Sequence, residues 1–296
     1  MTTRIGFIGL GLMGGAMARN LLAAGHTVIG YDLDAKKVDA IVSAGGKTMP
    51  PEQIPANVDA IMLSLPNSAI VNDVVKNTLK LTASERKGLI LVDASTADPQ
   101  MSTALAEELR TKGIAMIDAT VSGTSEMCIV KDIIFMIGGD EAAAKACTPF
   151  LSSISREVIY MGDNGAGAIS KLIVNLVLGL NRMALAEGLT LAKKAGLDQL
   201  QMLEVLKKSA AGSKIMDQKG YRMVRKEFLP AAGKSINYYK DVRLMLALGE
   251  RLDCPLPLIS FHAQALASQH AKGRSEWDSA NIISFYDDLA NVRQEK

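Results

Sequence analysis

Three glycines near the N-terminus have the spacing of a phosphate-binding turn. A G-x-G-x-x-G pattern follows directly after the apolar run of residues 4–8. Glycine permits a tight turn at the first position, lets a pyrophosphate approach the backbone at the second, and lets the next helix pack closely at the third. The N–H groups and the dipole at that helix start attract phosphates. The predicted cofactor contacts of this turn are Gly9, Leu10, Gly11, Leu12, Met13 and Gly14.

A carboxylate closes the second predicted strand. Asp32 follows the apolar run of residues 27–31, about twenty residues after the glycine turn. There a carboxylate accepts hydrogen bonds from the ribose hydroxyls of NAD and repels the 2′-phosphate of NADP. The sequence therefore favours NAD over NADP, although Lys36 and Lys37 could still meet a phosphate.

A lysine interrupts the longest apolar stretch of the chain. Lys171 lies within residues 169–180, and Asn175 shares its helix face at the i+4 position. Burial disfavours the charged amine, so we expect its pKa to fall from about 10.4 towards neutral pH, where it can exchange a proton. Alternatively, Lys171 reaches solvent or a buried carboxylate such as Asp241. The polar partner and the upstream dinucleotide turn favour an acid/base role.

The first half of the chain alternates predicted strands and helices. Besides the strands already named, we expect strands at residues 58–63, 89–92, 114–117, 133–137 and 158–160, and helices at residues 34–44, 68–79, 98–112 and 141–151. This order predicts an α/β domain over residues 1–162, with a mainly parallel, doubly wound sheet. Ligands bind beyond the carboxyl ends of such strands, which selects residues 65–67, 95–96 and 120–123.

Ser122 and Gly123 come directly after one of these strands. A serine hydroxyl and nearby backbone N–H groups can bind a carboxylate, but the same residues also make an ordinary helix cap. The spacing alone favours neither the carboxylate-binding site nor the helix cap.

The second half, residues 163–296, is predicted to be all helical. Residues 166–195 form one helix of about 45 Å. Its first half is apolar nearly all round, which predicts burial on every side. Asn181, Arg182 and Glu187 argue against a transmembrane helix. Further helices are expected at residues 199–210, 213–224, 234–252, 258–271 and 280–292.

Composition excludes several classes of protein. The 296 residues carry a net charge of +2, with no Lys/Arg run longer than a pair, which argues against a nucleic-acid surface. The 3 cysteines have no metal-ligand spacing and indicate a reducing compartment. The glycine-rich N-terminus lacks a cleavage site, and no uncharged apolar run is long enough to cross a membrane. We therefore expect a cytoplasmic protein, or one of an organelle matrix if a presequence has been removed, and no metal site.

Four stretches resemble the β-hydroxyacid dehydrogenase family, which includes 3-hydroxyisobutyrate dehydrogenase and tartronate semialdehyde reductase. They are GFIGLGLMGGAMARNLLAAGHTV, DATVSGT, GAGAISKLIVN and KDVRL, in family order and spacing over essentially the whole chain. The resemblance implies an N-terminal Rossmann domain, a long interdomain helix and an all-α C-terminal domain that helps to form homodimers or homotetramers.

The resemblance also implies roles for individual residues. Lys171 would be the catalytic acid/base and Asn175 would orient the substrate. The implied reaction is reversible hydride transfer between the nicotinamide and the alcohol carbon of a small 3-hydroxy acid, with Lys171 exchanging the hydroxyl proton. Other implied contacts are Ser122, Gly123 and Thr124 for the substrate carboxylate, and Leu65, Pro66, Thr96 and Lys240 for the cofactor. That role for Lys240 competes with an ordinary solvated position on a helix.

The sequence departs from the family in one loop. The family usually has proline where Thr120 stands and glycine where Thr124 stands, and residues 125–131 are neither small nor neutral here. We expect this loop to border the substrate, so the changes favour an acid bulkier or more polar than hydroxyisobutyrate. A threonine at 124 also adds a Cβ that penalises positive φ.

Three alternatives stay open. One is a tartronate semialdehyde reductase, or another semialdehyde reductase, that uses NADPH or NADH. Another is an imine reductase, which generally lacks the lysine and is disfavoured by Lys171. The last is an inactive cofactor-binding module that serves protein interactions, against which Lys171 and Asn175 both argue.

Overall fold

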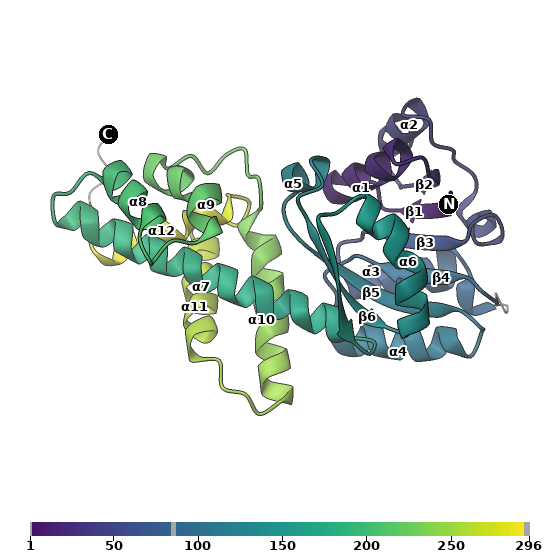
Figure 1. Cartoon of the computed structure of the whole chain (residues 1–296). Coiled ribbons are helices and arrows are strands. Elements are labelled where there is room, and N and C mark those ends of the chain that lie inside the picture. The colour runs from purple at the N-terminus through teal and green to yellow at the C-terminus, as the bar shows by residue number, and fades with distance from the viewer. Residues whose placement is uncertain (1, 84–86, 293–296) are drawn as a thin grey trace. The chain divides into compact units, whose positions relative to one another are not determined.

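The computed structural model describes residues 2–83 and 87–292, and it divides the chain into two compact units (Figure 1). The units are Met1–Lys171 and Leu172–Lys296, and the division falls inside the long helix α7 (Ala166–Lys194). The domain boundary expected at residues 162/163, just before this helix, stays a prediction.

The first unit is built on a seven-stranded sheet with the order β2-β1-β3-β4-β5-β6-β7. All neighbouring strands are parallel except β5 and β6, which are antiparallel. The expected doubly wound sheet is thus present, with one reversed pair near its edge. The strands are β1 (Arg4–Ile8), β2 (Thr27–Tyr31), β3 (Ala60–Leu63), β4 (Ile90–Asp93), β5 (Ala115–Ser122), β6 (Ile134–Gly139) and β7 (Glu157–Gly162).

Helices cover both faces of this sheet (Figure 1). Successive strand residues point to opposite faces of the sheet and so belong to two apolar cores. Phe7 belongs to the core with α1 and α6, and Ile8 belongs to the core with α3 and α4 on the opposite face. The helical elements of this unit are α1 (Leu12–Ala23), α2 (Ala35–Ser43), a 3₁₀ helix (Pro51–Ala56), α3 (Ser68–Asp73), a π-helical segment (Val74–Thr78), a 3₁₀ turn (Leu81–Ala83), α4 (Pro99–Arg110), α5 (Ser125–Ile129) and α6 (Glu141–Ser153).

The second unit is helical, as expected. Its core is formed by apolar side chains such as Leu185, Met223 and Leu266, from three different helices. After α7 come α8 (Gln199–Lys208), α9 (Lys214–Arg225), α10 (Ser235–Arg251), α11 (Pro257–Ala271), a 3₁₀ turn (Ser279–Asn281) and α12 (Ile282–Leu289).

The expected burial of α7 on every side is wrong for this chain. Ile173 and Val177 are 55% and 51% exposed, because they share one helix face that no other described residue covers. The helix α7 is long and apolar enough to cross a membrane. The core helix of a globular protein meets the same criteria of length and composition. Its Arg182 is 2% exposed and donates to Ser279 Oγ at 2.8 Å, so this charge is directed into the helical unit.

Candidate active site

The glycine turn joins β1 to α1, and its geometry explains the glycines. Gly9 has φ +90°, and a Cβ there would lie 2.4 Å from the carbonyl oxygen of Ser64. A Cβ on Gly14 would lie 2.0 Å from the carbonyl oxygen of Gly9, so the helix packs directly on the turn. A Cβ on Gly11 would meet nothing within 4 Å. The backbone at Gly11 is therefore open to a ligand.

The start of α1 is prepared for an anion. Gly11 is its N-cap and provides no side-chain cap, and the first turn contains no acidic residue. Leu12 is 81% exposed and Met13 is half-buried, so the first turn of the helix lies at the surface. Unpaired N–H groups at the positive end of a helix dipole attract phosphate.

Asp32, at the end of β2, is already fixed in place. Its Oδ2 accepts from Leu10 N at 2.7 Å, and its Oδ1 accepts from Asp34 N at 2.9 Å. Lys37 Nζ lies 3.4 Å from Oδ1. Burial raises the pKa of Asp32, but the two backbone N–H groups and the Lys37 charge outweigh it and hold the pKa below its usual value. Asp32 is thus a preorganised anion beside the turn.

A cavity of about 470 Å³ opens where the order of the strands reverses, between β1 and β3. Ligands of doubly wound sheets bind at this place. The glycine turn and Asp32 line the cavity, together with Leu65 and Pro66, which follow β3. The full lining is Ile8, Gly9, Gly11, Tyr31, Asp32, Leu33, Lys37, Ser64, Leu65, Pro66, Ile70, Asp73, Val74 and Thr78.

These features fit a dinucleotide. The open backbone at Gly11 and the uncapped start of α1 suit a pyrophosphate, and the fixed Asp32 carboxylate suits the two ribose hydroxyls. The sequence left NADP possible because Lys36 and Lys37 could meet its 2′-phosphate. In this structure Lys37 instead forms an ion pair with the Asp32 carboxylate.

Ser95, which the sequence selected, and Asp93, which it missed, form a buried pair that holds the wall of this cavity. Leu65 N donates to Ser95 Oγ at 2.9 Å, and Ser95 N donates to Asp93 Oδ1 at 2.9 Å. Asp93 is 1% exposed, and burial, opposed by the Ser95 hydrogen bonds and assisted by the Asp118 charge, raises its pKa to about 6. An aspartate at the end of an apolar strand was the available signal. Thr96, the next residue along, is half-buried.

Asp118 fixes the first turn of α7 and was also missed. Its Oδ1 accepts from Gly165 N and its Oδ2 from Ala168 N, both at 2.8 Å. Burial raises the pKa of this carboxyl group, although the backbone hydrogen bonds oppose the shift. An acidic residue inside the apolar strand β5 was again the signal.

This anchor lies at the level where the other strands end. In the register of the sheet, Asp118 pairs with Asp93, the last residue of β4, which pairs with Leu63, the last residue of β3. Leu63 in turn pairs with Ile8, which precedes the glycine turn. The start of α7 is therefore tied to the carboxyl edge of the sheet, where the cavity opens.

Thr120 strengthens the same attachment. Its hydroxyl donates to the carbonyl oxygen of Gly167 at 2.7 Å, and its side chain is 1% exposed. The expectation that this departure from the family borders the substrate is therefore wrong for Thr120. Its short polar side chain caps a carbonyl group of α7 instead.

Lys171 follows this anchored turn. It is half-buried, one helical turn beyond Gly167, and it is the last residue of the first unit. The sheet thus fixes the part of α7 that carries the amine.

Ser122 is the last residue of β5, and Gly123 follows it towards α5. Gly123 has φ +148°, and a Cβ there would lie 2.6 Å from Ile133 Cγ2, so only glycine fits without rearrangement. The cap of α5 is Thr124, whose hydroxyl accepts from Met127 N at 3.3 Å. The capping interpretation is therefore wrong for Ser122 and Gly123, and Ser122 is half-buried at the strand end.

The predicted conflict at Thr124 does not arise. Its φ is −96°, an ordinary value for a residue with a Cβ. The rest of the loop forms α5, whose Cys128 is buried and whose carbonyl oxygen accepts from Asn20 Nδ2 of α1 at 2.7 Å. Much of this loop is thus occupied with packing against α1.

In the second unit, Asn175 is fixed at both its backbone and its side chain. Asn175 Nδ2 donates to Asp241 Oδ2 at 3.0 Å, and the hydroxyl of Tyr238 donates to the carbonyl oxygen of Asn175 at 3.1 Å. Lys240 Nζ lies 3.5 Å from Asp241 Oδ1, and the Lys240 side chain is 37% exposed. Asp241 therefore contacts Asn175 rather than standing apart on a solvated face.

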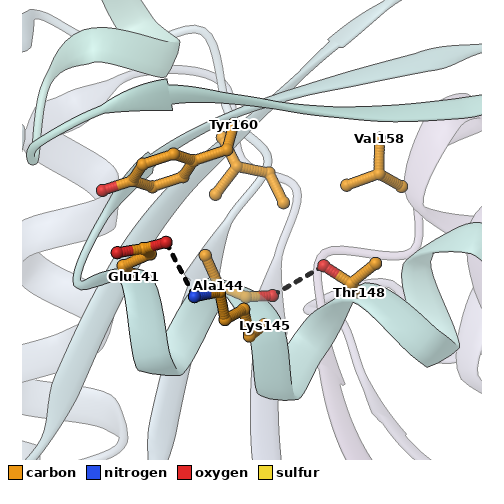
Figure 2. A pocket seen from close by; sticks show the side chains of 7 residues that line it. Glu141, Ala144, Lys145, Thr148, Val158 and Tyr160 are labelled. Carbon is orange, nitrogen blue, oxygen red and sulfur yellow. Dashed lines mark hydrogen bonds and ion pairs between the residues drawn. The ribbon is translucent and has the colours of Figure 1, made fainter.

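A smaller cavity of about 100 Å³ lies at the outer edge of the sheet and contains none of the predicted residues (Figure 2). Lys145 Nζ pairs with Glu141 Oε1 at 2.7 Å, and the Thr148 hydroxyl donates to the carbonyl oxygen of Ala144 at 2.8 Å (Figure 2). The Tyr160 hydroxyl donates to the carbonyl oxygen of Gly139 at 2.9 Å. These polar groups already have protein partners.

Comparison with known proteins identifies both halves of the chain. Residues 4–162 match the family described as the NAD binding domain of 6-phosphogluconate dehydrogenase. Residues 165–286 match the family described as NAD-binding of NADP-dependent 3-hydroxyisobutyrate dehydrogenase.

Relatives match over nearly the full length. The 2-(hydroxymethyl)glutarate dehydrogenase of Eubacterium barkeri is 33% identical, over 98% of this chain and 96% of its own. The chloroplastic glyoxylate/succinic semialdehyde reductase 2 of Arabidopsis thaliana is 32% identical, over 95% of this chain and 79% of its own.

A solved structure agrees with these relatives. The 3-hydroxyisobutyrate dehydrogenase of Mycobacterium tuberculosis, solved with L-serine, aligns with a TM-score of 0.85 and 26% identity, over 96% of this chain and 99% of its own. Because both halves match families that bind a nicotinamide cofactor and the relatives match over nearly the full length, the chain belongs to the β-hydroxyacid dehydrogenase family. It is an NAD(P)-dependent hydroxyacid dehydrogenase.

Proposed function

We propose that this enzyme uses NAD in preference to NADP and that it interconverts a small 3-hydroxy acid and the corresponding carbonyl compound. The support for NAD is Asp32, whose carboxylate is held by Leu10 N and Asp34 N at the end of β2. A 2′-phosphate would place a second anion against this carboxylate, whereas a free ribose would supply two donors.

The single observation that carries the proposed chemistry is the anchoring of α7. Both oxygens of Asp118 hold the first turn of this helix at the carboxyl edge of the sheet, one turn before Lys171. If the nicotinamide binds at this edge, the Lys171 amine would lie where proton exchange with a substrate alcohol requires it.

The roles of the residues follow from this chemistry. When bound, NAD supplies the hydride acceptor for the alcohol carbon. Lys171 Nζ takes the hydroxyl proton as the carbonyl forms, and it returns the proton to the oxygen in the reverse direction. Ser122 and the backbone at Gly123 hold the substrate carboxylate, with Thr124 beside them. Asn175 orients the hydroxyl group.

The remaining contacts are proposed on the family resemblance. Thr96 and Lys240 would contact the cofactor, together with Leu65 and Pro66, which line the cavity. Asp241, which binds the Asn175 amide at 3.0 Å, would keep that amide in one orientation.

We also propose that the enzyme acts as a homodimer or homotetramer in the cytoplasm, without a membrane or nucleic acid. Support for self-association comes from exposed apolar side chains on two helices. Ile173 and Val177 of α7 are 55% and 51% exposed, and Leu258 and Phe261 of α11 are 64% and 49% exposed. Apolar groups gathered on a helix face are typical of an interface.

A panel of substrates tests the proposal. The purified enzyme is assayed with 3-hydroxy acids and with small semialdehydes, each with NAD(H) and NADP(H), by the absorbance of the reduced nicotinamide. We expect turnover of at least one 3-hydroxy acid, with a higher kcat/KM for NAD than for NADP. Turnover of semialdehydes alone, with NADPH, would favour a semialdehyde reductase, which the Arabidopsis relative supports. Cofactor binding without any turnover would favour an interaction module.

A further inference from the structure

The wall of the cofactor cavity contains a π-helical turn. The helix α3 continues directly into the π segment Val74–Thr78, where Leu79 N donates to the carbonyl oxygen of Val74 at 2.8 Å, five residues back. Turns of this kind are rare and occur frequently at functional sites. Ile70, Asp73, Val74 and Thr78 from this stretch all line the cavity.

The π turn changes which side chains share a face. In an α-helix, Asp73 and Thr78 would be about 140° apart around the axis, because each residue advances by about 100°. A turn closed by hydrogen bonds five residues apart is wider than an α-helical turn, so residue i+5 returns closer to the face of residue i. The wide turn is therefore what presents the Asp73 carboxylate and the Thr78 hydroxyl to the same cavity.

Both groups have capacity for a ligand. Asp73 Oδ1 accepts from Asn77 Nδ2 at 2.8 Å, which holds the carboxylate in place. Among residues 2–83 and 87–292, Asp73 Oδ2 and the Thr78 hydroxyl have no hydrogen-bond partner in the protein. The cavity thus offers one fixed acceptor and one hydroxyl that can donate.

The order of the groups in a dinucleotide indicates which group would lie next to Asp73 and Thr78. With the pyrophosphate at Gly11 and the ribose at Asp32, the base lies beyond the ribose, between apolar side chains of Leu33, Ile70 and Val74. A flat heterocycle between apolar walls then turns one polar edge towards the π turn.

We propose that Asp73 and Thr78 read the 6-amino edge of the adenine, so that the enzyme distinguishes a 6-aminopurine from a 6-oxopurine dinucleotide. This inference rests on the proposed use of NAD. The carboxylate accepts from the exocyclic amino group, and the hydroxyl donates to the neighbouring ring nitrogen, as amide side chains do when they recognise adenine. Hypoxanthine presents a carbonyl oxygen in place of the amino group, and the Asp73 carboxylate repels it.

Binding of NAD and of nicotinamide hypoxanthine dinucleotide tests this inference by isothermal titration calorimetry. The two differ only at the base edge, so contacts with the pyrophosphate, ribose and nicotinamide cancel. For the wild type we expect NAD to bind about tenfold more tightly than nicotinamide hypoxanthine dinucleotide. This ratio is near the lower end of the discrimination that paired contacts to a base provide, because Asp73 is exposed.

Two variants identify the responsible groups. Asp73→Asn replaces one carboxylate oxygen by an amide that can donate to the hypoxanthine carbonyl, so the preference for NAD should disappear or invert. Thr78→Val keeps the shape but removes the hydroxyl, and it should weaken the binding of both dinucleotides, because ring nitrogen N7 is an acceptor in adenine and in hypoxanthine alike. Asp39→Asn is the matched control, because Asp39 is an exposed carboxylate on α2 outside the cavity lining. It should keep the wild-type ratio.

The failures of the two proposals are distinguishable. Equal affinity of the wild type for the two dinucleotides, or an unchanged ratio in Asp73→Asn, would overturn the reading of the base while leaving NAD as the cofactor. If neither dinucleotide bound, the proposed use of NAD would be wrong, and the present inference with it.

Discussion

Asp93 gives the sharpest prediction of stability, because its carboxyl group is buried and, among the described residues, makes a hydrogen bond through only one of its oxygens. The carboxyl group is 1% exposed, its Oδ1 accepts from Ser95 N at 2.9 Å, and its Oδ2 has no hydrogen-bond partner among the residues that the structure describes. Burial, opposed by the Ser95 hydrogen bonds and assisted by the Asp118 charge, raises its pKa from 3.8 to about 6.

The sign of the pH dependence follows from this shift. Between the two pKa values the folded state binds a proton that the unfolded state has released, so the free energy of unfolding falls as the pH rises through this window. The stabilising contribution is complete below pH 3.8 and is lost above pH 6. A difference of about 2 pKa units corresponds to about 3 kcal/mol.

Asp93→Asn removes this dependence. The amide has the same shape, keeps an acceptor for Ser95 N, and stays neutral at every pH. We expect the difference in the free energy of unfolding, variant minus wild type, to increase by about 3 kcal/mol when the pH rises from about 4 to about 7.5. The other titrating groups are common to the two proteins, so their contributions cancel in the difference, except that of Asp118, whose charge acts on Asp93.

The assay is urea denaturation followed by circular dichroism, at several pH values across this window, for the wild type and the variant. The burial of the amide changes the absolute stability of the variant by the same amount at every pH. Only the change with pH therefore reports the ionisation of Asp93. A difference between the two proteins that stays constant from acid to neutral pH would refute the reasoning.

Three further predictions concern the cofactor turn, the anchor of α7 and the end of β5. Asp32→Ala should weaken NAD binding about 10–100-fold and leave NADP binding much less affected, because the variant loses charge-assisted hydrogen bonds to the ribose; an unchanged preference in titrations with both cofactors would contradict this. Asp118→Asn should lower the free energy of unfolding by about 1–3 kcal/mol, because one buried N–H group of α7 loses its acceptor; an unchanged urea midpoint would show that the anchor contributes nothing. Gly123→Ala should lower the melting temperature and substrate affinity together, because a Cβ there lies 2.6 Å from Ile133 Cγ2 at a φ of +148°; calorimetry and KM measurements check both.

Local patterns predicted much of the architecture. The glycine turn, the strand that precedes it and the alternation that follows are read from neighbouring residues, and the observed β1, α1 and β2 lie where these patterns indicate. The reversed direction of β6 depends on which strands pair across the sheet, and no local pattern encodes that choice. The π turn at Val74–Thr78 was likewise read as ordinary helix, because its apolar spacing fits either geometry.

The supporting residues of the site were harder to predict than the site itself. Asp118 and Asp93 matter through hydrogen bonds to backbone groups, of which Gly165 and Ala168 are far along the chain from Asp118. Thr120 was expected to border the substrate because it belongs to the loop in which the sequence departs from the family. The structure shows that its hydroxyl caps Gly167, which a comparison of residue types could not show.

Lys171→Ala tests the proposed mechanism most directly. The variant and the wild type are compared with NAD and a 3-hydroxy acid that the wild type oxidises, with Lys194→Ala, an exposed lysine of the same helix, as the control. We expect kcat to fall about 10²–10⁴-fold while the Kd for NAD stays within about threefold, because only the proton exchange is lost. Near-normal turnover by Lys171→Ala, with NAD still bound, would contradict the proposed role of this amine.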